Sequence, residues 1–201
     1  MAKVHFYYST MNAGKSTSLL QSNHNYEIRG HKTYLFTPRV DAEINDGKIH
    51  SRIGLSKSAE IFDEDFDFKK YFLRKSKENI ACILLDEAQF LTEIQVRQLC
   101  FVCDELNVPV MCYGIRTDFK GNLFSGSAGL LSLADNLIEL KTICEHENCS
   151  RKATMIARVD QSGNIITAGQ QVEIGSDNYK VYCRRHYRCL LYTSPSPRDV
   201  P

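Results

Sequence analysis

The chain has 201 residues, which is enough for one sizeable domain and a smaller appendage. Lys and Arg total 25 against 24 Asp and Glu, a net charge of +1, so long-range attraction to a polyanion is not indicated and we expect no nucleic-acid partner. No apolar run approaches the length of a membrane span and the N-terminus has no signal-peptide pattern, which predicts a cytoplasmic protein without a membrane partner.

The first predicted strand, at residues 4–8, leads into the loop STMNAGKS and then into a predicted helix at residues 14–29. The loop fits the phosphate-binding pattern GxxxxGK[ST], except that Ser9 replaces the first glycine. In such a loop, backbone amides bind phosphate, Lys15 reaches the β- and γ-phosphates, and the Ser16 hydroxyl binds Mg²⁺. The alternative is a turn of small residues that happens to contain a lysine. The strand before and the helix after favour a nucleotide-binding loop made of Ser9, Thr10, Met11, Asn12, Ala13, Gly14, Lys15 and Ser16.

Strand-like and helix-like segments continue to alternate up to about residue 142. Apolar runs predict further strands at residues 32–37, 80–85, 108–115 and 137–143. Helices are predicted at residues 65–77, 92–106 and 123–135, and Thr92 with Gln95 has the spacing of a capping box. Residues 38–59 show no clear period and are interpreted as a long loop. The alternation predicts an α/β fold like that of P-loop NTPases, with a mainly parallel sheet flanked by helices.

Two adjacent carboxylates, Asp86 and Glu87, follow the buried strand at residues 80–85. In a protein with a phosphate-binding loop, the first acid at this sheet edge holds Mg²⁺ directly or through water. The second points elsewhere and could take a proton from an attacking hydroxyl. An acidic turn at a strand end is common, so the pair alone is weak evidence. Together with the loop it predicts a catalytic site with Mg²⁺ held by Ser16 and Asp86.

Eight cysteines in a cytoplasmic chain are not expected to form disulfides. Those in apolar segments are interpreted as core thiols: Cys82, Cys100, Cys103 and Cys112. A second set is suited to a tetrahedral structural zinc site: Cys144, Cys149, Cys183 and His186. The C-x₄-C spacing is long for such a site, and His146 competes with Cys149 as the fourth ligand. The alternative is four unlinked residues in a loop-rich region. A bound metal is favoured, because a small appendage with little core needs a stabilising cross-link.

After residue 143 the alternation gives way to short strand-like runs separated by turn residues. These runs lie at residues 153–159, 165–168, 170–174 and 179–183. The predicted domains are therefore a nucleotide-binding domain at residues 1–142 and a zinc-binding β-appendage at residues 143–189. Residues 190–201 (LLYTSPSPRDVP) suit a disordered or non-native tail and resemble a translated sequencing-adapter remnant.

Several motifs occur in the order found in one enzyme family. They are FYYSTMNAGKST, SRIGLS at 51–56, LLDEAQFL at 84–91, CYGIRTDFKGNLF at 112–124, LKTIC and CRRHY. Over residues 3–188 the chain resembles the zinc-containing type II thymidine kinases of bacteria, large viruses and animal cytosol. The resemblance implies transfer of the γ-phosphoryl of ATP to the 5′-hydroxyl of deoxythymidine with Mg²⁺, in a homotetramer inhibited by dTTP.

The resemblance also implies roles for single residues. Glu87 matches the proton acceptor and would act with Lys15 in catalysis. The segment bordering the phosphates would be Asp86, Glu87, Ala88 and Gln89.

Residues expected to enclose the thymine ring are Met11, Ile115, Phe119 and Phe124, although each could equally be a core residue. Tyr179, with the backbone of Ile174 and Gly175, matches the loop that closes over the nucleoside, as a nucleoside-covering part of the appendage.

Three alternatives remain open at this point. A deoxynucleoside kinase of broader preference would have the same fold and site. A P-loop ATPase acting on nucleic acid is suggested by DEAQ after a strand, but the balanced charge and small size disfavour it. A structural zinc module with a vestigial nucleotide site would turn over no nucleoside.

Overall fold

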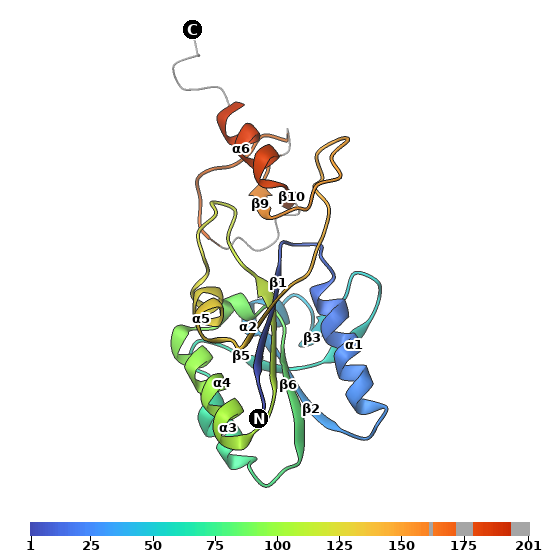
Figure 1. Ribbon diagram of the computed structural model, residues 1–201, viewed down its shortest axis with the longest axis vertical. Coiled ribbons are helices and arrows are strands. Elements are labelled where there is room, and N and C mark those ends of the chain that lie inside the picture. Colours follow the sequence, from blue (N-terminus) through green and yellow to red (C-terminus); the bar gives the residue numbers. More distant parts are fainter. Residues whose placement is uncertain (161–162, 172–178, 194–201) are drawn as a thin grey trace. The chain divides into compact units, whose positions relative to one another are not determined.

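The computed structural model describes residues 1–160, 163–171 and 179–193 (Figure 1). The chain divides into two compact units. The first, the sheet unit, contains residues 1–8, 14–116 and 124–140. The second, the zinc unit, contains residues 9–13, 117–123 and the chain from residue 141 onward. The predicted boundary at residue 142 stays a prediction, since two loops that precede it, residues 9–13 and 117–123, belong to the zinc unit.

A six-stranded sheet forms the centre of the sheet unit, with the strand order β5-β2-β6-β7-β1-β8. Its strands are β1 (Val4–Ser9), β2 (Lys32–Pro38), β5 (Glu60–Phe62), β6 (Ile80–Leu85), β7 (Val110–Ile115) and β8 (Asn136–Glu139). The pairings β1–β8, β2–β5, β2–β6 and β6–β7 are all parallel. The predicted α/β fold with a mainly parallel sheet is therefore confirmed. Parallel strands place their carboxyl ends at one edge, which is where such folds bind ligands.

Alternate side chains of the central strands enter two different cores. Leu84 and Tyr113 face α1 (Lys15–Glu27), where they pack with Leu19 and Leu20. Leu85 and Cys112 belong to the opposite core, beneath α3 (Phe68–Arg74), α4 (Glu93–Leu106) and α5 (Ser125–Leu133). Figure 1 shows α1 on one side of the sheet and α3, α4 and α5 on the other. Burial on both faces explains the continuous apolar run of β6.

The helix ends follow local capping chemistry. The capping box of α4 is confirmed, because Thr92 accepts from the Gln95 backbone N–H and the Gln95 side chain accepts from that of Thr92. Asp67 caps α3 by accepting from the backbone N–H of Lys70, so that helix begins three residues later than predicted. Asn107 ends α4 in the left-handed conformation.

The prediction of a loop over residues 38–59 is wrong. This stretch forms the short helix α2 (Arg39–Ala42) and an antiparallel hairpin of β3 (Lys48–His50) and β4 (Ser56–Ser58). The hairpin was hidden in the sequence because Ile49 is its one fully buried side chain and β4 is exposed throughout. The edge strand β5 also went unpredicted, since three residues carry little periodicity.

In the zinc unit, β9 (Met155–Arg158) and β10 (Tyr179–Tyr182) form an antiparallel pair, and α6 (Arg184–Thr193) follows. The predicted strand at residues 165–168 is reduced to one bridge between Ile165 and Val159. Most of the predicted strand at residues 170–174 lies outside the described residues. A disordered or non-native tail was predicted from residue 190. Residues 190–193 are instead helical, and Leu190 and Leu191 pack on the core of this unit, whereas the non-native origin of the tail stays a prediction. Residues 194–201 lie outside the described residues.

Candidate functional site

The loop between β1 and α1 has the backbone conformation of an anion-binding turn. Gly14 has φ 75° and Asn12 has φ 62°, both in the left-handed region. Helix α1 begins at Lys15, directly after Gly14. A helix start after a glycine turn directs backbone N–H groups and partial positive charge outward. Glycine suits this position, because a side chain at φ 75° would be strained.

Within the sheet unit, the first turn of α1 lies beside the carboxyl end of β6. The Ser16 side chain hydrogen-bonds to Asp86, and the Lys15 ammonium interacts with the charges of both Asp86 and Glu87. Lys15 is 7% exposed. Burial lowers its pKa, while the two carboxylates oppose this shift. The two distant segments that the sequence paired are thus brought together.

Asp86 combines burial with an unmet hydrogen-bonding capacity. It is 2% exposed, and among the described residues its Oδ1 atom has no hydrogen-bond partner. Burial raises the pKa of this carboxyl and the neighbouring Glu87 charge raises it further, while Ser16 and Lys15 act in the opposite direction. A buried carboxylate oxygen without a partner is costly unless a ligand engages it. This oxygen, next to the Ser16 hydroxyl, is the hard oxygen donor that Mg²⁺ prefers.

Glu87 lies one residue further, in a different environment. Its backbone adopts φ 45°, and its side chain is half-buried. The 3₁₀ turn η1 (Ala88–Phe90) follows, and its residues Ala88 and Gln89 are buried. Gln89 donates from Nε2 to Glu87 Oε2 at 2.5 Å and accepts at Oε1 from the backbone N–H of Ile115 at 3.1 Å.

The residues predicted to enclose thymine are divided between the two units. In the sheet unit, Ile115 ends β7 half-buried, and the buried Phe124 ring lies 6.1 Å from the Phe90 ring. In the zinc unit, Met11 is half-buried and Tyr179 is the first residue of β10. Ile174 and Gly175 lie outside the described residues, so their predicted role is not tested.

Phe119, also in the zinc unit, is held by an extended set of contacts. The Lys120 ammonium lies 5.3 Å and the Arg158 guanidinium carbon 5.7 Å from the centre of its ring. The Tyr187 hydroxyl donates to the Phe119 backbone carbonyl at 2.6 Å. Tyr187 directly follows the predicted zinc ligand His186, so the position of Phe119 depends on the segment that carries that ligand.

Asp118 and Gln171 are supporting residues that sequence reasoning missed. Asp118 is 4% exposed and accepts from the backbone N–H groups of Lys120 and Asn122, which closes the turn around Phe119. Gln171 donates to the other carboxylate oxygen of Asp118 at 3.2 Å. The sequence Asp118-Phe-Lys-Gly-Asn carries a recognisable turn signal, but nothing in it identifies the partner 53 residues away.

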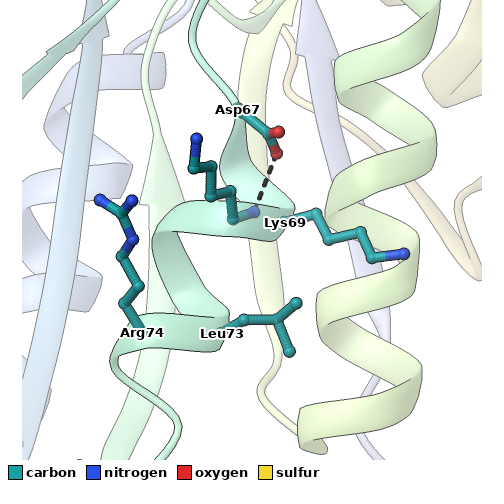
Figure 2. Close-up of a pocket in the computed structure, with 5 residues that line it drawn as sticks. Asp67, Lys69, Leu73 and Arg74 are labelled. Atoms are coloured by element: carbon teal, nitrogen blue, oxygen red, sulfur yellow. Dashed lines mark hydrogen bonds between the residues drawn. The ribbon is translucent and has the colours of Figure 1, made fainter.

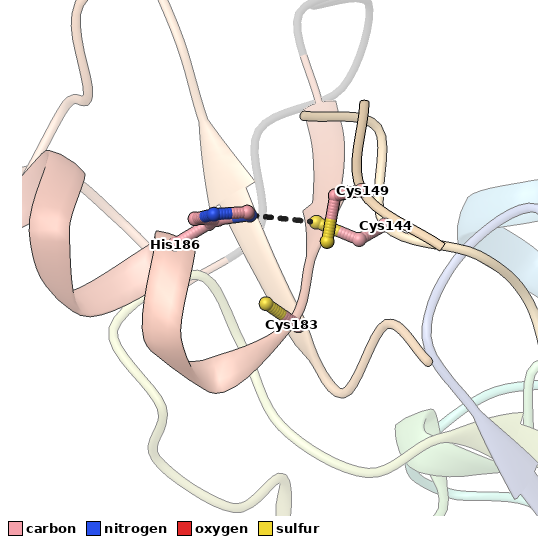
Figure 3. A group of neighbouring side chains, drawn as sticks. All are labelled: Cys144, Cys149, Cys183 and His186. Atoms are coloured by element: carbon pink, nitrogen blue, oxygen red, sulfur yellow. Dashed lines mark hydrogen bonds between the residues drawn. The ribbon is translucent and has the colours of Figure 1, made fainter. Parts of the chain in front are cut away.

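Four side chains of the zinc unit converge as Figure 3 shows. The ligand atoms of Cys144, Cys149, Cys183 and His186 all lie within 4.8 Å of one another. Cys144 Sγ and His186 Nδ1 are 3.5 Å apart. The cysteines are free thiols. Three sulfurs and one imidazole nitrogen at this spacing fit a closed tetrahedral zinc site.

The long C-x₄-C spacing is accommodated by a turn. Asn148 adopts φ 55°, and the Cys149 backbone N–H donates to the His146 carbonyl at 3.1 Å. This turn brings Cys149 into the cluster and leaves His146 outside it. The His146 ring instead stacks on the His186 ring, with 3.8 Å between their centres. The geometry therefore favours Cys149 as the fourth ligand.

A separate open hollow of about 390 Å³ lies beside α3 (Figure 2). It is lined by Asp67, Lys69, Lys70, Leu73 and Arg74. None of these residues belongs to the predicted sites. Lys69 is also engaged with the Phe101 ring, 4.0 Å from its centre, and Asp67 serves as the helix cap.

Comparison with known proteins matches residues 2–187 to the family model "Thymidine kinase". The chain is 50% identical to the thymidine kinase of Rhodopirellula baltica over 194 residues, which are 96% of this chain and 90% of that protein. It is 51% identical to the thymidine kinase of Photobacterium profundum over 193 residues, 95% of this chain and 99% of that protein. For the thymidine kinase of Shewanella oneidensis the identity is 48% over 194 residues, 96% of this chain and 100% of that protein.

Proposed function

The chain belongs to the thymidine kinase family, and on that basis we propose that it transfers the γ-phosphoryl of ATP to the 5′-hydroxyl of deoxythymidine, giving dTMP. The observation that carries this proposal is the meeting of Lys15 and Ser16 with Asp86 and Glu87 beside one end of the sheet. A phosphate-binding loop and a carboxylate pair in contact supply the two halves of a phosphoryl-transfer site.

The phosphate half of the site consists of the loop Ser9–Ser16. Its backbone N–H groups and the start of α1 would hold the ATP phosphates, and the Lys15 ammonium would lie against their outer oxygens. Ser16 and Asp86 would hold Mg²⁺, consistent with the buried Asp86 oxygen that lacks a hydrogen-bond partner among the described residues. When bound, the ion would neutralise phosphate charge and help to align the triphosphate.

Glu87 is the residue that would accept the proton of the 5′-hydroxyl. Its carboxylate is half-buried, whereas that of Asp86 is fully buried, so the two adjacent acids can serve a hydroxyl and a metal separately. Alignment of the hydroxyl with the γ-phosphorus and electrostatic stabilisation of the phosphoryl charge together supply most of the acceleration in such reactions, and a positioned base adds about 10²–10⁴-fold.

The family resemblance assigns nucleoside contacts to Met11, Phe119 and Tyr179 of the zinc unit and to Ile115 and Phe124 of the sheet unit. Ring-face packing by the two phenylalanines would admit a pyrimidine and exclude a purine. Within the zinc unit, the contacts that hold Phe119, from Tyr187 and the two neighbouring cations, support a fixed orientation of its ring for contact with a base.

The zinc site is proposed to be structural, because all four tetrahedral positions would be filled by protein atoms. A homotetramer and inhibition by dTTP follow from the family resemblance, whereas a cytoplasmic location was predicted from the sequence pattern; all three stay predictions. The described part of the chain contains no helix that is both long and apolar enough to cross a membrane.

The test is a phosphoryl-transfer assay with labelled ATP and a panel of nucleosides. We expect product with deoxythymidine and deoxyuridine, and none with purine deoxynucleosides. Glu87→Gln should lower kcat by about 10²–10⁴-fold while ATP binding persists. Efficient phosphorylation of all deoxynucleosides would indicate the broader-specificity kinase. ATP hydrolysis stimulated by polynucleotide, without deoxythymidine phosphorylation, would contradict the proposal.

A further inference from the structure

We propose that Gln89 is a positioning residue that fixes the carboxylate of Glu87 for proton acceptance, an inference that rests on the proposed function of Glu87. Gln89 is 2% exposed. Its side chain spans from the Glu87 carboxylate to the backbone of β7, with contacts of 2.5 Å and 3.1 Å at its two ends. A short hydrogen bond to a charged acceptor is among the stronger ones in proteins.

The chemistry of the partners determines which way the amide faces. A backbone N–H can only donate, so the Gln89 oxygen must face Ile115. The NH₂ group is then necessarily turned toward the carboxylate of Glu87, which in its ionised form can only accept. Each end of the amide therefore meets a partner of the complementary kind, and a flipped amide would lose both hydrogen bonds.

The surrounding backbone confines this side chain. At Gly114 on β7, an added Cβ would lie 2.8 Å from Gln89 Oε1 and 3.0 Å from the Gln89 backbone nitrogen. The glycine thus allows the turn after Glu87 to approach the strand closely. Because the Gln89 amide is buried and occupied at both ends by protein atoms, we favour this supporting role over direct contact with phosphate.

The consequence for the reaction lies in the position of one carboxylate. With Oε2 of Glu87 engaged by Gln89, Oε1 is the atom left to accept the hydroxyl proton. A base that wanders by about an ångström loses much of its effect, since the gain depends on a fixed near-attack geometry. Substrates would still bind through other residues. Removal of the Gln89 amide should therefore affect kcat and leave KM nearly unchanged.

The experiment compares two Gln89 variants with a matched buried glutamine. Gln89→Met removes both hydrogen bonds at similar length, whereas Gln89→Glu keeps an oxygen for Ile115 but presents a carboxylate to Glu87. We expect kcat to fall about tenfold or more in both, with KM for ATP and deoxythymidine within about twofold. Gln95 is 1% exposed and caps α4, so Gln95→Met should lower the melting temperature and leave kcat unchanged.

A double-mutant cycle separates positioning from a merely structural role. If Gln89 acts through Glu87, then Gln89→Met should change kcat by less than about twofold in the Glu87→Gln background. A double variant whose kcat falls by the product of the two single reductions would overturn the inference. An unchanged kcat in Gln89→Met, while Glu87→Gln is impaired, would also overturn it. Full activity of Glu87→Gln would instead remove the proposed base and the inference with it. If Gln89→Met does not fold, Gln89→Glu is tested in the otherwise unchanged protein, and an unchanged kcat in that variant would overturn the inference.

Discussion

Removal of zinc is expected to unfold the hairpin of β9 and β10 while the six-stranded sheet stays folded. Among the described residues, the core beside the hairpin contains five that are buried, and two of them, Cys144 and Cys183, are predicted zinc ligands. The larger core of the sheet unit contains twenty buried residues and none of the four ligands. The two units therefore depend on the metal to very different degrees.

The size of the effect can be worked from the hairpin itself. Its buried apolar side chains are Ile156 and Val181 on one face and Ala157 and Tyr182 on the other, all at most 7% exposed. Full burial of a large apolar side chain contributes about 1.5–3 kcal/mol, whereas ordering one backbone residue costs about 1–2 kcal/mol. With eight strand residues to order and only three large side chains buried, the entropy cost exceeds the gain from burial, in keeping with the marginal stability of isolated two-stranded hairpins. A structural zinc site contributes on the order of 10 kcal/mol, which decides the balance.

The assay is hydrogen exchange by mass spectrometry on the full chain before and after chelation, with zinc content measured by elemental analysis. Amides of β9 and β10 should lose protection on chelation, and those of β6 and β7 should keep it. Cys149→Ser should reproduce this pattern without chelator. Cys189→Ser is the matched control, since Cys189 is an exposed thiol of α6 outside the cluster.

Two outcomes would refute this reasoning. Unchanged protection of β9 and β10 in protein verified to be free of zinc would show that the small core suffices alone. Loss of bound zinc in His146→Ala, with retention in Cys149→Ser, would show that His146 is the ligand and that the stacked arrangement of His146 on His186 is not the metal-bound one.

Three further variants probe the two sites. Asp86→Asn should abolish Mg²⁺-dependent turnover yet raise the melting temperature of the ligand-free protein at pH 8. Burial raises the pKa of Asp86, so the folded protein loses stability as pH rises above the ordinary value of 3.8, and the gain in melting temperature should vanish near pH 3.8. A variant without a higher melting temperature at pH 8 would contradict this. Tyr187→Phe leaves the buried Phe119 carbonyl without its donor, so we expect KM for deoxythymidine to rise and KM for ATP to stay constant. Tyr182→Phe is the control, and equal changes in both KM values would contradict the prediction. Gly14→Ala places a side chain at φ 75°, which should cost about 1–2 kcal/mol in thermal or denaturant unfolding; no loss of stability would show that the loop can relax.

The parts of the fold that could be predicted are those marked by a local sequence pattern, such as a continuous apolar run or a capping motif. β6 is apolar throughout because both of its faces are covered, and Thr92 with Gln95 identifies the start of α4 from local chemistry alone. β3 and β4 could not be found in this way, because Ile49 is their one fully buried residue. The helical residues 190–193 were misjudged on composition, although Leu190 and Leu191 pack on the zinc unit.

The candidate site shows the same division between local and distant information. Spacing alone was enough to pair Lys15 with Asp86, because both motifs have fixed positions relative to strands. Spacing could not assign the positioning role of Gln89, because that role depends on a hydrogen bond to Ile115, 26 residues further along the chain. Asp118 and Tyr187 were missed for the same reason: a turn signal shows that a loop closes, but not which residue holds it.

The adjacency of Asp86 and Glu87 poses a geometric problem that the backbone solves. Neighbouring residues in a strand point to opposite faces of the sheet. If the strand simply continued, Asp86 and Glu87 would therefore lie on opposite faces, and not together in one site with one acid buried and the other accessible. The chain leaves β6 and places Glu87 at φ 45°, a conformation that costs a non-glycine residue about 1–2 kcal/mol. Such strain persists only where the surroundings enforce it, and here the buried turn η1 and the Gln89 hydrogen bond do so. The cost is confined to the one residue that, on the proposed mechanism, must meet the substrate hydroxyl.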